Sequence, residues 1–379
     1  MDRDELAAWL RLTLTDGVGN GSARKLLAAF GLPESIFDQS APALRQVVSA
    51  VQAQALQAEP EGLTALLDTT LDWLRSSEDG VRRRIAVLGS PEYPEPLLAL
   101  EDPPLVLYLM GVDLAPQAVA QGIAVVGSRN PTPQGETNAR QFAQALAGAG
   151  LTVVSGLALG VDGAAHQGAL DGAAPGQLAT IAVVGTGLDR VYPKRHLALA
   201  RAIARQGLLL SEYPLGTPPL APNFPKRNRL ISGLSRGTLV VEAALQSGSL
   251  ITARQALEQG KDVFAIPGSI HSPQSRGCHS LIKQGAKLVE SAQDILEELG
   301  PGFAPALIAD SGRLAGTSSP NDPESPLLQA LGFDPVSIDA LVARTGTDAA
   351  TLQARLLELE LDGVVARLPG GLFQRLASA

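Results

Sequence analysis

The segment IAVVGSRNPTPQGETNARQFAQALAGAGLTVVSG, residues 123–156, decides the fold. Its apolar runs at 123–127 and 151–156 are short and end in glycine, a pattern typical of strands that are buried on both faces of a sheet. Residues 136–149 between them have the length and composition of a crossover helix. The segment therefore predicts a β-α-β unit with two parallel strands.

Similar apolar runs recur along the chain at 180–187, 207–213, 238–244 and 262–268. Helical segments at 196–205 and 251–259 separate several of them. Buried strands that alternate with helices indicate a doubly wound, mostly parallel sheet. We therefore expect an α/β fold with an extended Rossmann-like domain over residues 81–300. Five prolines lie within residues 91–108, where we expect an irregular connection.

The N-terminal segment, residues 1–80, is rich in Ala, Leu and Gln with helical spacing, which predicts an all-helical module of the SAM-like or helix-hairpin-helix type. A glycine-containing turn at 16–19 lies between two of its predicted helices. Such a turn could expose backbone N–H groups to a phosphate, or it could be an ordinary tight turn. The acidic character of this segment favours the ordinary turn.

The C-terminal part begins with a segment, residues 301–323, that is rich in Pro, Ser, Gly and Asp and is typical of a flexible linker. Residues 324–379 contain three helical segments and a Gly370-Gly371 hairpin turn, which predict a winged-helix domain. Its third helix, at 348–361, is predominantly acidic. We therefore expect this domain to contact other proteins or to have an architectural role rather than to read DNA.

The composition, with 379 residues of which 45% are hydrophobic and 18% charged, indicates a globular chain of several domains. No apolar run approaches the ~18 residues of a membrane helix. The N-terminal residues are acidic, unlike a secretory signal. Cys278 is the single cysteine, which excludes a disulfide framework and fits a cytoplasmic location. The four histidines lack ligand spacing, so we expect no metal site.

The net charge of -8 is unevenly distributed. Residues 1–80 and 301–379 carry the acidic excess, whereas residues 81–300 contain 19 basic and 17 acidic groups. Within 189–236 there are nine basic residues against two acidic ones. Nucleic-acid-binding surfaces need such a local positive excess, so this part of the chain is the best candidate for one.

Glycine loops follow the predicted strands and should meet at one edge of the sheet. Gly127, Ser128 and Arg129 combine backbone N–H donors with a guanidinium, which suits a phosphate. Residues 185–190 match the dinucleotide fingerprint only in part, so we expect no cofactor. Gly248 and Ser249 should provide further backbone donors at the same edge.

The stretch APNFPKRNRL, residues 221–230, places an aromatic ring beside three cations and an asparagine. This pairing of a stacking face with phosphate neutralisation is typical of single-stranded nucleic acid binding. We expect these residues to form a loop whose shape the two prolines restrict. The candidate DNA-binding side chains of this stretch are Phe224, Lys226, Arg227, Asn228 and Arg229.

Several longer strings resemble the DNA-processing protein A (DprA, also Smf) family. They cover residues 120–290 in order: VVGSRNPTPQG (125–135), SGLALGVDGAAHQGAL (155–170), TIAVVGTGLDRVYPKRH (180–196), NFPKRNRLISGLSRGTLVVEAALQSGSLITARQALEQGKDVFAIPG (223–268) and GCHSLIKQGAKLV (277–289).

The resemblance implies a cytoplasmic, non-enzymatic protein that binds single-stranded DNA taken up in natural transformation, protects it and helps to load the RecA recombinase. It also implies an extended Rossmann core that forms a homodimer. By motif, the DNA pocket uses Arg129, Lys194, Phe224, Arg227, Asn228 and Arg229. The dimer contact falls on His279 and Leu288, although simple core packing is an equally open reading of Leu288.

One alternative comes from another class of protein, a Rossmann-like nucleotide-processing enzyme of the phosphoribohydrolase type. Glu242, which follows the apolar run at 238–241, would then be its catalytic carboxylate. No Pro-Gly-Gly run precedes this segment, as it does in those enzymes, which counts against the alternative. A third interpretation is an adaptor whose acidic ends contact partner proteins.

Overall fold

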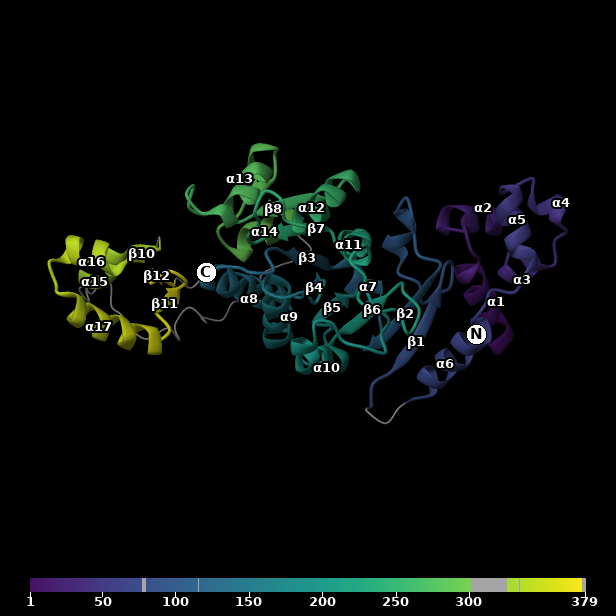
Figure 1. Cartoon of the computed structure of the whole chain (residues 1–379), viewed down its shortest axis with the longest axis horizontal. Helices are drawn as coiled ribbons and strands as arrows, with labels where there is room; N and C mark the ends of the chain where they lie inside the picture. The colour runs from purple at the N-terminus through teal and green to yellow at the C-terminus, as the bar shows by residue number, and fades with distance from the viewer. Residues whose placement is uncertain (77–79, 115, 301–325, 334, 377–379) are drawn as a thin grey trace.

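The computed structural model describes residues 1–76, 80–114, 116–300, 326–333 and 335–376. Its largest unit is a sheet in the order β1-β2-β6-β5-β4-β3-β7-β8-β9 (Figure 1). All neighbouring strands are parallel except the β1-β2 and β2-β6 pairs. The strands are β1 (Arg83–Val87), β2 (Val106–Gly111), β3 (Gly122–Val126), β4 (Thr152–Ser155), β5 (Thr180–Val183), β6 (Leu208–Ser211), β7 (Gly237–Val240), β8 (Asp262–Ala265) and β9 (Lys287–Leu288). The predicted doubly wound α/β fold is confirmed.

The expectation of an irregular connection over residues 91–108 is wrong at its C-terminal end. Residues 91–105 contain only the short 3₁₀ helix η1 (Glu95–Ala99), but β2 begins at Val106. Pro103 and Pro104 lie just before this strand, so they remove none of its hydrogen bonds. β1 was also not predicted, because its first two residues are arginines and its apolar run is therefore only three residues long.

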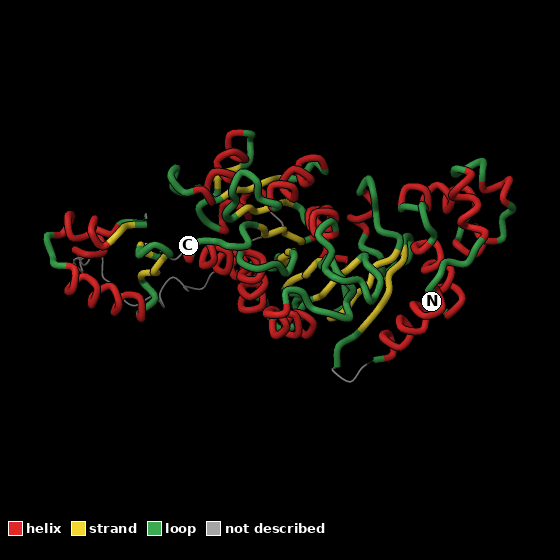
Figure 2. The backbone as a smooth tube through the Cα atoms, viewed as in Figure 1, coloured by secondary structure: helices red, strands yellow, loops and turns green. Residues whose placement is uncertain are grey.

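Helices cover both faces of the sheet, as the tube in Figure 2 shows. Side chains alternate along β3, so Ile123 and Val125 pack into one core and Ala124 and Val126 into the other. The first core includes side chains of α8 (Pro133–Gly148), α9 (Val161–Gly172) and α14 (Ala292–Leu299), and α10 (Leu197–Gln206) lies next to α9. The second includes side chains of α11 (Asn223–Gly233), α12 (Ser249–Glu258) and α13 (Arg276–Lys283). The shorter elements are α7 (Pro116–Ala120), η2 (Lys194–His196) and η3 (Pro273–Ser275).

The N-terminal module is all-helical, as predicted, and packs against β1 and β2. The Trp73 ring lies 5.9 Å from the Tyr108 ring of β2, and Arg24 donates a 2.9 Å hydrogen bond to the Glu101 carbonyl. The Gln52 amide donates to the Gly17 carbonyl at 2.8 Å, which ties the turn at 16–19 to a neighbouring helix. This bond engages a carbonyl, whereas a phosphate would need the N–H groups of the turn, so both interpretations of the turn stay predictions. The helices are α1 (Arg3–Leu14), α2 (Asn20–Phe30), α3 (Pro33–Phe37), α4 (Ala41–Leu44), α5 (Ala50–Gln57) and α6 (Leu63–Arg75).

The C-terminal unit is the predicted winged helix, with helices followed by a hairpin around its own small core. Asp348 caps the third helix by accepting a 3.0 Å bond from the Thr351 N–H. The elements are α15 (Pro326–Leu331), β10 (Val336–Ser337), α16 (Ile338–Thr345), α17 (Ala349–Leu361), β11 (Val365–Leu368) and β12 (Leu372–Arg375). The linker predicted at 301–323 lies outside the described residues. Among the described helices, none is both long and apolar enough to cross a membrane.

Candidate nucleic-acid interface

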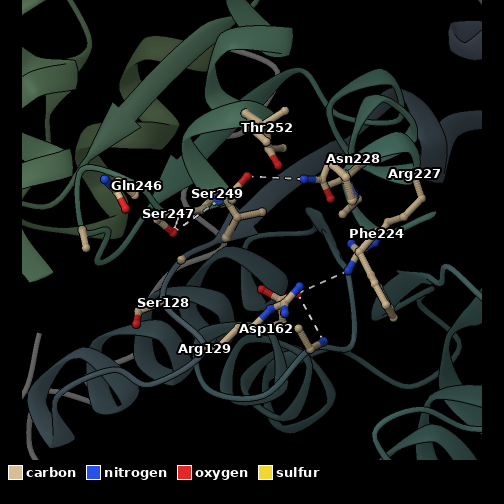
Figure 3. Close-up of a pocket in the computed structure, with 18 of the residues that line it drawn as sticks. Ser128, Arg129, Asp162, Phe224, Arg227, Asn228, Gln246, Ser247, Ser249 and Thr252 are labelled. Carbon is tan, nitrogen blue, oxygen red and sulfur yellow. Dashed lines mark hydrogen bonds and ion pairs between the residues drawn. The ribbon is translucent and has the colours of Figure 1, made fainter. Parts of the chain in front are cut away.

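A cavity of about 580 Å³ lies where the chain reverses its direction of winding across the sheet. From β3 the chain adds β4, β5 and β6 on one side and then returns to place β7 on the other side of β3. Loops at the carboxyl ends of β3 and β7 must therefore diverge and leave a crevice, which is where open α/β sheets bind ligands. The 126–130 loop, the first turns of α11 and the 244–252 segment line this crevice (Figure 3).

The loop after β3 brings Gly127, Ser128 and Arg129 to the cavity, as the sequence predicted. One of the expected backbone donors is already in use, because the Ser128 N–H donates a 2.7 Å bond to the Glu242 carbonyl. This part of the expectation is wrong, since the bond ties the β3 loop to the β7 loop and leaves that N–H unavailable to a phosphate. The cationic contribution of the loop is therefore the Arg129 guanidinium.

An aromatic and cationic cluster forms one wall of the cavity. Phe224 lies in the first turn of α11, and the Arg129 guanidinium carbon is 5.7 Å from the centre of its ring. The Tyr192 ring lies 5.5 Å from the Phe224 ring at an interplanar angle of 37° and lines a small space that adjoins the cavity rather than the cavity itself. Sequence reasoning did not single out Tyr192 as a site residue, although its position in the basic string RVYPKR was a signal. The two rings and the guanidinium together make a surface suited to a nucleobase.

The expected loop at 221–230 is wrong, because residues from Asn223 onward form helix α11. The helical spacing separates the cations that the sequence had grouped. Phe224, Arg227 and Asn228 line the cavity, and the Asn228 amide lies 3.4 Å from the Gly248 carbonyl of the α12 N-terminus. Lys226 is exposed and lies outside this lining.

Arg229 occupies a different environment. Its guanidinium forms an ion pair with the buried carboxylate of Glu212 and approaches Asp102 at 3.6 Å. The Arg229 side chain is only 11% exposed and does not line the cavity. The structure therefore does not bring Arg229 together with the other predicted DNA contacts.

Arg227 forms the floor of the cavity and is almost fully buried. Its Nη2 donates a 2.8 Å bond to the Gly156 carbonyl and lies 3.9 Å from the Asp162 carboxylate. Asp162 in turn accepts bonds from the Gly156 and Ala158 N–H groups at 3.1 and 3.3 Å. Burial raises the pKa of Asp162 and lowers that of Arg227. A side chain at Gly156 would meet Arg227 Nη1 at 1.7 Å, so only glycine permits this close packing.

A buried histidine network supports the same floor. Leu157 has a positive φ of 57°, and its N–H donates a 3.3 Å bond to His166 Nε2. The Thr180 hydroxyl donates to the Val153 carbonyl at 2.6 Å, so it must accept the proton on His166 Nδ1 at 2.7 Å. Burial lowers the pKa of His166 to about 3. The imidazole is therefore neutral and is a structural support rather than a proton donor.

Glu242 does not reach the cavity. Its carboxylate accepts bonds from the Thr132 N–H at 2.9 Å and the Thr132 hydroxyl at 2.6 Å, at the start of α8. Burial raises its pKa. The carboxylate that a phosphoribohydrolase-type reaction would need is thus used to hold α8 to the β7 loop. Within the described ranges, no group of three His, Cys, Asp or Glu side chains could hold a metal ion.

The remaining predicted residues lie around the cavity or far from it. Gly248 and Ser249 line the cavity at the N-terminus of α12, and Lys194 is exposed in η2, close in sequence to Tyr192. Leu288 belongs to the last strand of the sheet and is 50% exposed, so the core-packing reading of this residue is wrong. His279 is half-buried and its Nε2 lies 3.0 Å from the Gly268 carbonyl.

The architecture is that of a Rossmann-type protein with a helical module before the sheet and a winged helix after it. A sequence profile of the family described as DNA recombination-mediator protein A matches residues 84–300, and a DprA winged-helix profile matches residues 311–371. The chain belongs to the DNA recombination-mediator protein A family.

Individual relatives agree with this assignment. The chain is 44% identical to Protein Smf of Escherichia coli over 80% of each chain, and 49% identical to the DNA processing protein DprA of Streptococcus pneumoniae over 54% of this chain and 71% of that one. The crystal structure of the Streptococcus pneumoniae protein has a TM-score of 0.64 at 36% identity, covering 79% of this chain and 98% of that chain. A Helicobacter pylori DNA processing protein A, whose structure is described by its single-stranded DNA binding mode, has a TM-score of 0.51 at 31% identity over 58% and 98%.

Proposed function

We propose that this chain binds single-stranded DNA in the cavity between the β3 and β7 loops and acts in recombination as a non-enzymatic mediator. The observation that carries the proposal is the placement of the Arg129 guanidinium beside the Phe224 and Tyr192 rings. A base can stack on such a surface while its phosphate meets the guanidinium. The single-stranded DNA binding described for the Helicobacter pylori neighbour supports the same ligand.

The electrostatics of the site favour a polyanion. Lys194 and Lys226 are exposed, make no ion pair within the described residues and flank the aromatic wall in sequence. The α12 N-terminus at Gly248 and Ser249 has no acidic residue in its first turn. The helix dipole and these cations therefore attract phosphate, whereas Asn228 offers an amide to a base or a sugar. Arg227 contributes indirectly, because its hydrogen bond to the Gly156 carbonyl holds the floor of the cavity in place.

Binding titrations by fluorescence anisotropy test this proposal. We expect Arg129→Glu to weaken binding of an oligothymidylate at least about tenfold, because an attraction becomes a repulsion. Log affinity should fall steeply with log salt between about 50 and 200 mM. The matched control is Arg254→Glu on α12, an exposed arginine outside the cavity lining. Full affinity in Arg129→Glu, or equal losses in both variants, would place the site elsewhere.

The further roles rest on the family resemblance. We propose a cytoplasmic homodimer in which His279 and the exposed Leu288 contact the second copy, so that two cavities bind one strand with increased avidity. We also propose that the protein helps to load RecA on the bound strand. Leu288→Asp should produce monomers in light scattering, and RecA filament formation on protein-bound DNA tests the loading. An unchanged dimer in Leu288→Asp would contradict the assigned interface.

A further inference from the structure

A second cavity of about 660 Å³ lies on the other side of the β3 loop and shares Arg129 and Asn130 with the first. The first turns of α8 and α9 and the segment before α10 form its walls. Figure 1 shows α8, α9 and α10 next to one another along one face of the sheet. A smaller space of about 70 Å³, lined by Arg129, Tyr192 and Phe224, adjoins both cavities.

The second cavity is cationic. Arg129, Arg140 and Arg195 line it, and Glu136 is the acidic residue among its lining. Arg195 is exposed, and its side chain has no hydrogen bond or ion pair with any other described residue. Arg140 pairs with Asp171 at 2.6 Å but remains 56% exposed on its side chain. An arginine held at a concave surface without a protein partner is available to a phosphate.

The position of Arg195 is set by its neighbour His196. The His196 Nδ1 lies 3.0 Å from the Leu157 carbonyl, and its ring packs so closely on Gly163 that a side chain there would meet it at 2.8 Å. Leu157 belongs to the loop that also forms the floor of the first cavity through Gly156 and Arg227. The same loop thus anchors both the floor of the first cavity and the segment that presents Arg195.

We propose that the second cavity is a further binding subsite for the same DNA strand, which passes over Arg129 and places its next phosphates at Arg195 and Arg140. This inference rests on the proposed function. Continuity favours a polynucleotide over a free anion, because the cavities share one arginine and an adjoining space rather than being separate depressions. The arginines bind phosphates, which are the same in every sequence, so we expect the contribution of the subsite to affinity to be independent of base sequence.

The test measures how substitutions of two arginines on neighbouring segments change the affinity for DNA of two lengths. Arg195→Ala removes the subsite cation, and Arg205→Ala removes an exposed arginine near the far end of α10, outside the cavities. The probes are oligothymidylates of about 12 and about 3 nucleotides, of which the shorter cannot occupy both cavities. Circular dichroism and thermal unfolding confirm that each variant is folded.

We expect Arg195→Ala to weaken binding of the longer probe by about fivefold and to leave the shorter probe unaffected. The slope of log affinity against log salt for the longer probe should become less steep by about 0.7, the value for one phosphate contact on single-stranded DNA. Arg205→Ala should change neither quantity. Unchanged binding of the longer probe, or equal losses for both probes, would overturn the second subsite.

Arg129→Glu separates this inference from the proposed function. If Arg129→Glu abolishes binding of the shorter probe whereas Arg195→Ala leaves the longer probe unchanged, the first cavity stands and the second subsite fails. If Arg129→Glu binds the shorter probe with full affinity, the proposed function itself fails. Competition of inorganic phosphate with the longer probe at millimolar concentration would show a general anion site and would also overturn the polynucleotide assignment.

Discussion

Replacement of Asp162 by alanine tests whether the buried ion pair supports the floor of the DNA cavity. The substitution removes the carboxylate opposite Arg227, whose guanidinium is almost fully buried and 3.9 Å away. It also removes the acceptor for the N–H groups of Gly156 and Ala158. Arg227 would keep its 2.8 Å bond to the Gly156 carbonyl but would remain as a buried positive charge without a counterion.

The expected cost follows from this geometry. Removing one partner of a buried ion pair destabilises a protein by about 3–5 kcal/mol, because the remaining charge is desolvated without compensation. For a domain of this size, each kcal/mol corresponds to about 2–4 °C in Tm. We therefore expect Asp162→Ala to lower the Tm of the sheet domain by about 6–20 °C.

Differential scanning calorimetry of the whole chain measures this effect. The matched control is Asp171→Ala, a substitution on the same helix as Asp162, α9, that breaks the exposed pair with Arg140 of α8 and should cost less than about 1 kcal/mol. Asp162→Asn should lie between the two, since its amide oxygen can still accept bonds from Gly156 and Ala158. The reasoning is refuted if Asp162→Ala lowers the Tm no more than Asp171→Ala does.

Other consequences concern the aromatic wall and the two further buried groups. Phe224→Ala should weaken oligothymidylate binding by about 1–3 kcal/mol in an anisotropy titration, whereas Phe224→Trp should retain affinity; equal binding by the alanine variant would remove the ring from the site. Because the pKa of His166 falls from 6.5 to about 3 on folding, only the unfolded chain gains a proton there as the pH drops below about 6.5. Urea unfolding should therefore give about 1.4 kcal/mol less stability at about pH 5.5 than above pH 7, and His166→Gln should abolish this part of the loss; an unchanged pH dependence in the variant would contradict it. Glu242→Ala leaves the Thr132 N–H and hydroxyl without their acceptor and should cost about 2 kcal/mol in the same assay, so an unchanged midpoint would contradict its structural role.

The fold could be predicted wherever local pattern and tertiary environment agree. The glycine-bounded apolar runs become parallel strands because only a strand buried on both faces can be apolar throughout. The edge of the sheet where ligands bind follows from the same pattern, so Gly127, Arg129 and Gly248 were correctly predicted to lie together. The strands β1 and β2 were not predicted because arginines begin β1 and prolines precede β2, and α11 was taken for a loop because Pro222 precedes it and Pro225 lies in its first turn.

The sequence by itself determined the class of fold, the family and the presence of a cationic segment with an aromatic residue. Only the tertiary structure decided what each cation does. Arg227 and Arg229 are two positions apart and chemically identical, yet one forms the cavity floor beside Asp162 and the other pairs with Glu212 outside the cavity. A guanidinium has the same charge in every sequence, but its burial and its nearest carboxylate depend on which face of α11 it occupies. Tyr192 joins Phe224 for the same reason, because residues 32 positions apart meet only when the sheet brings the loop before η2 and the first turn of α11 to one edge.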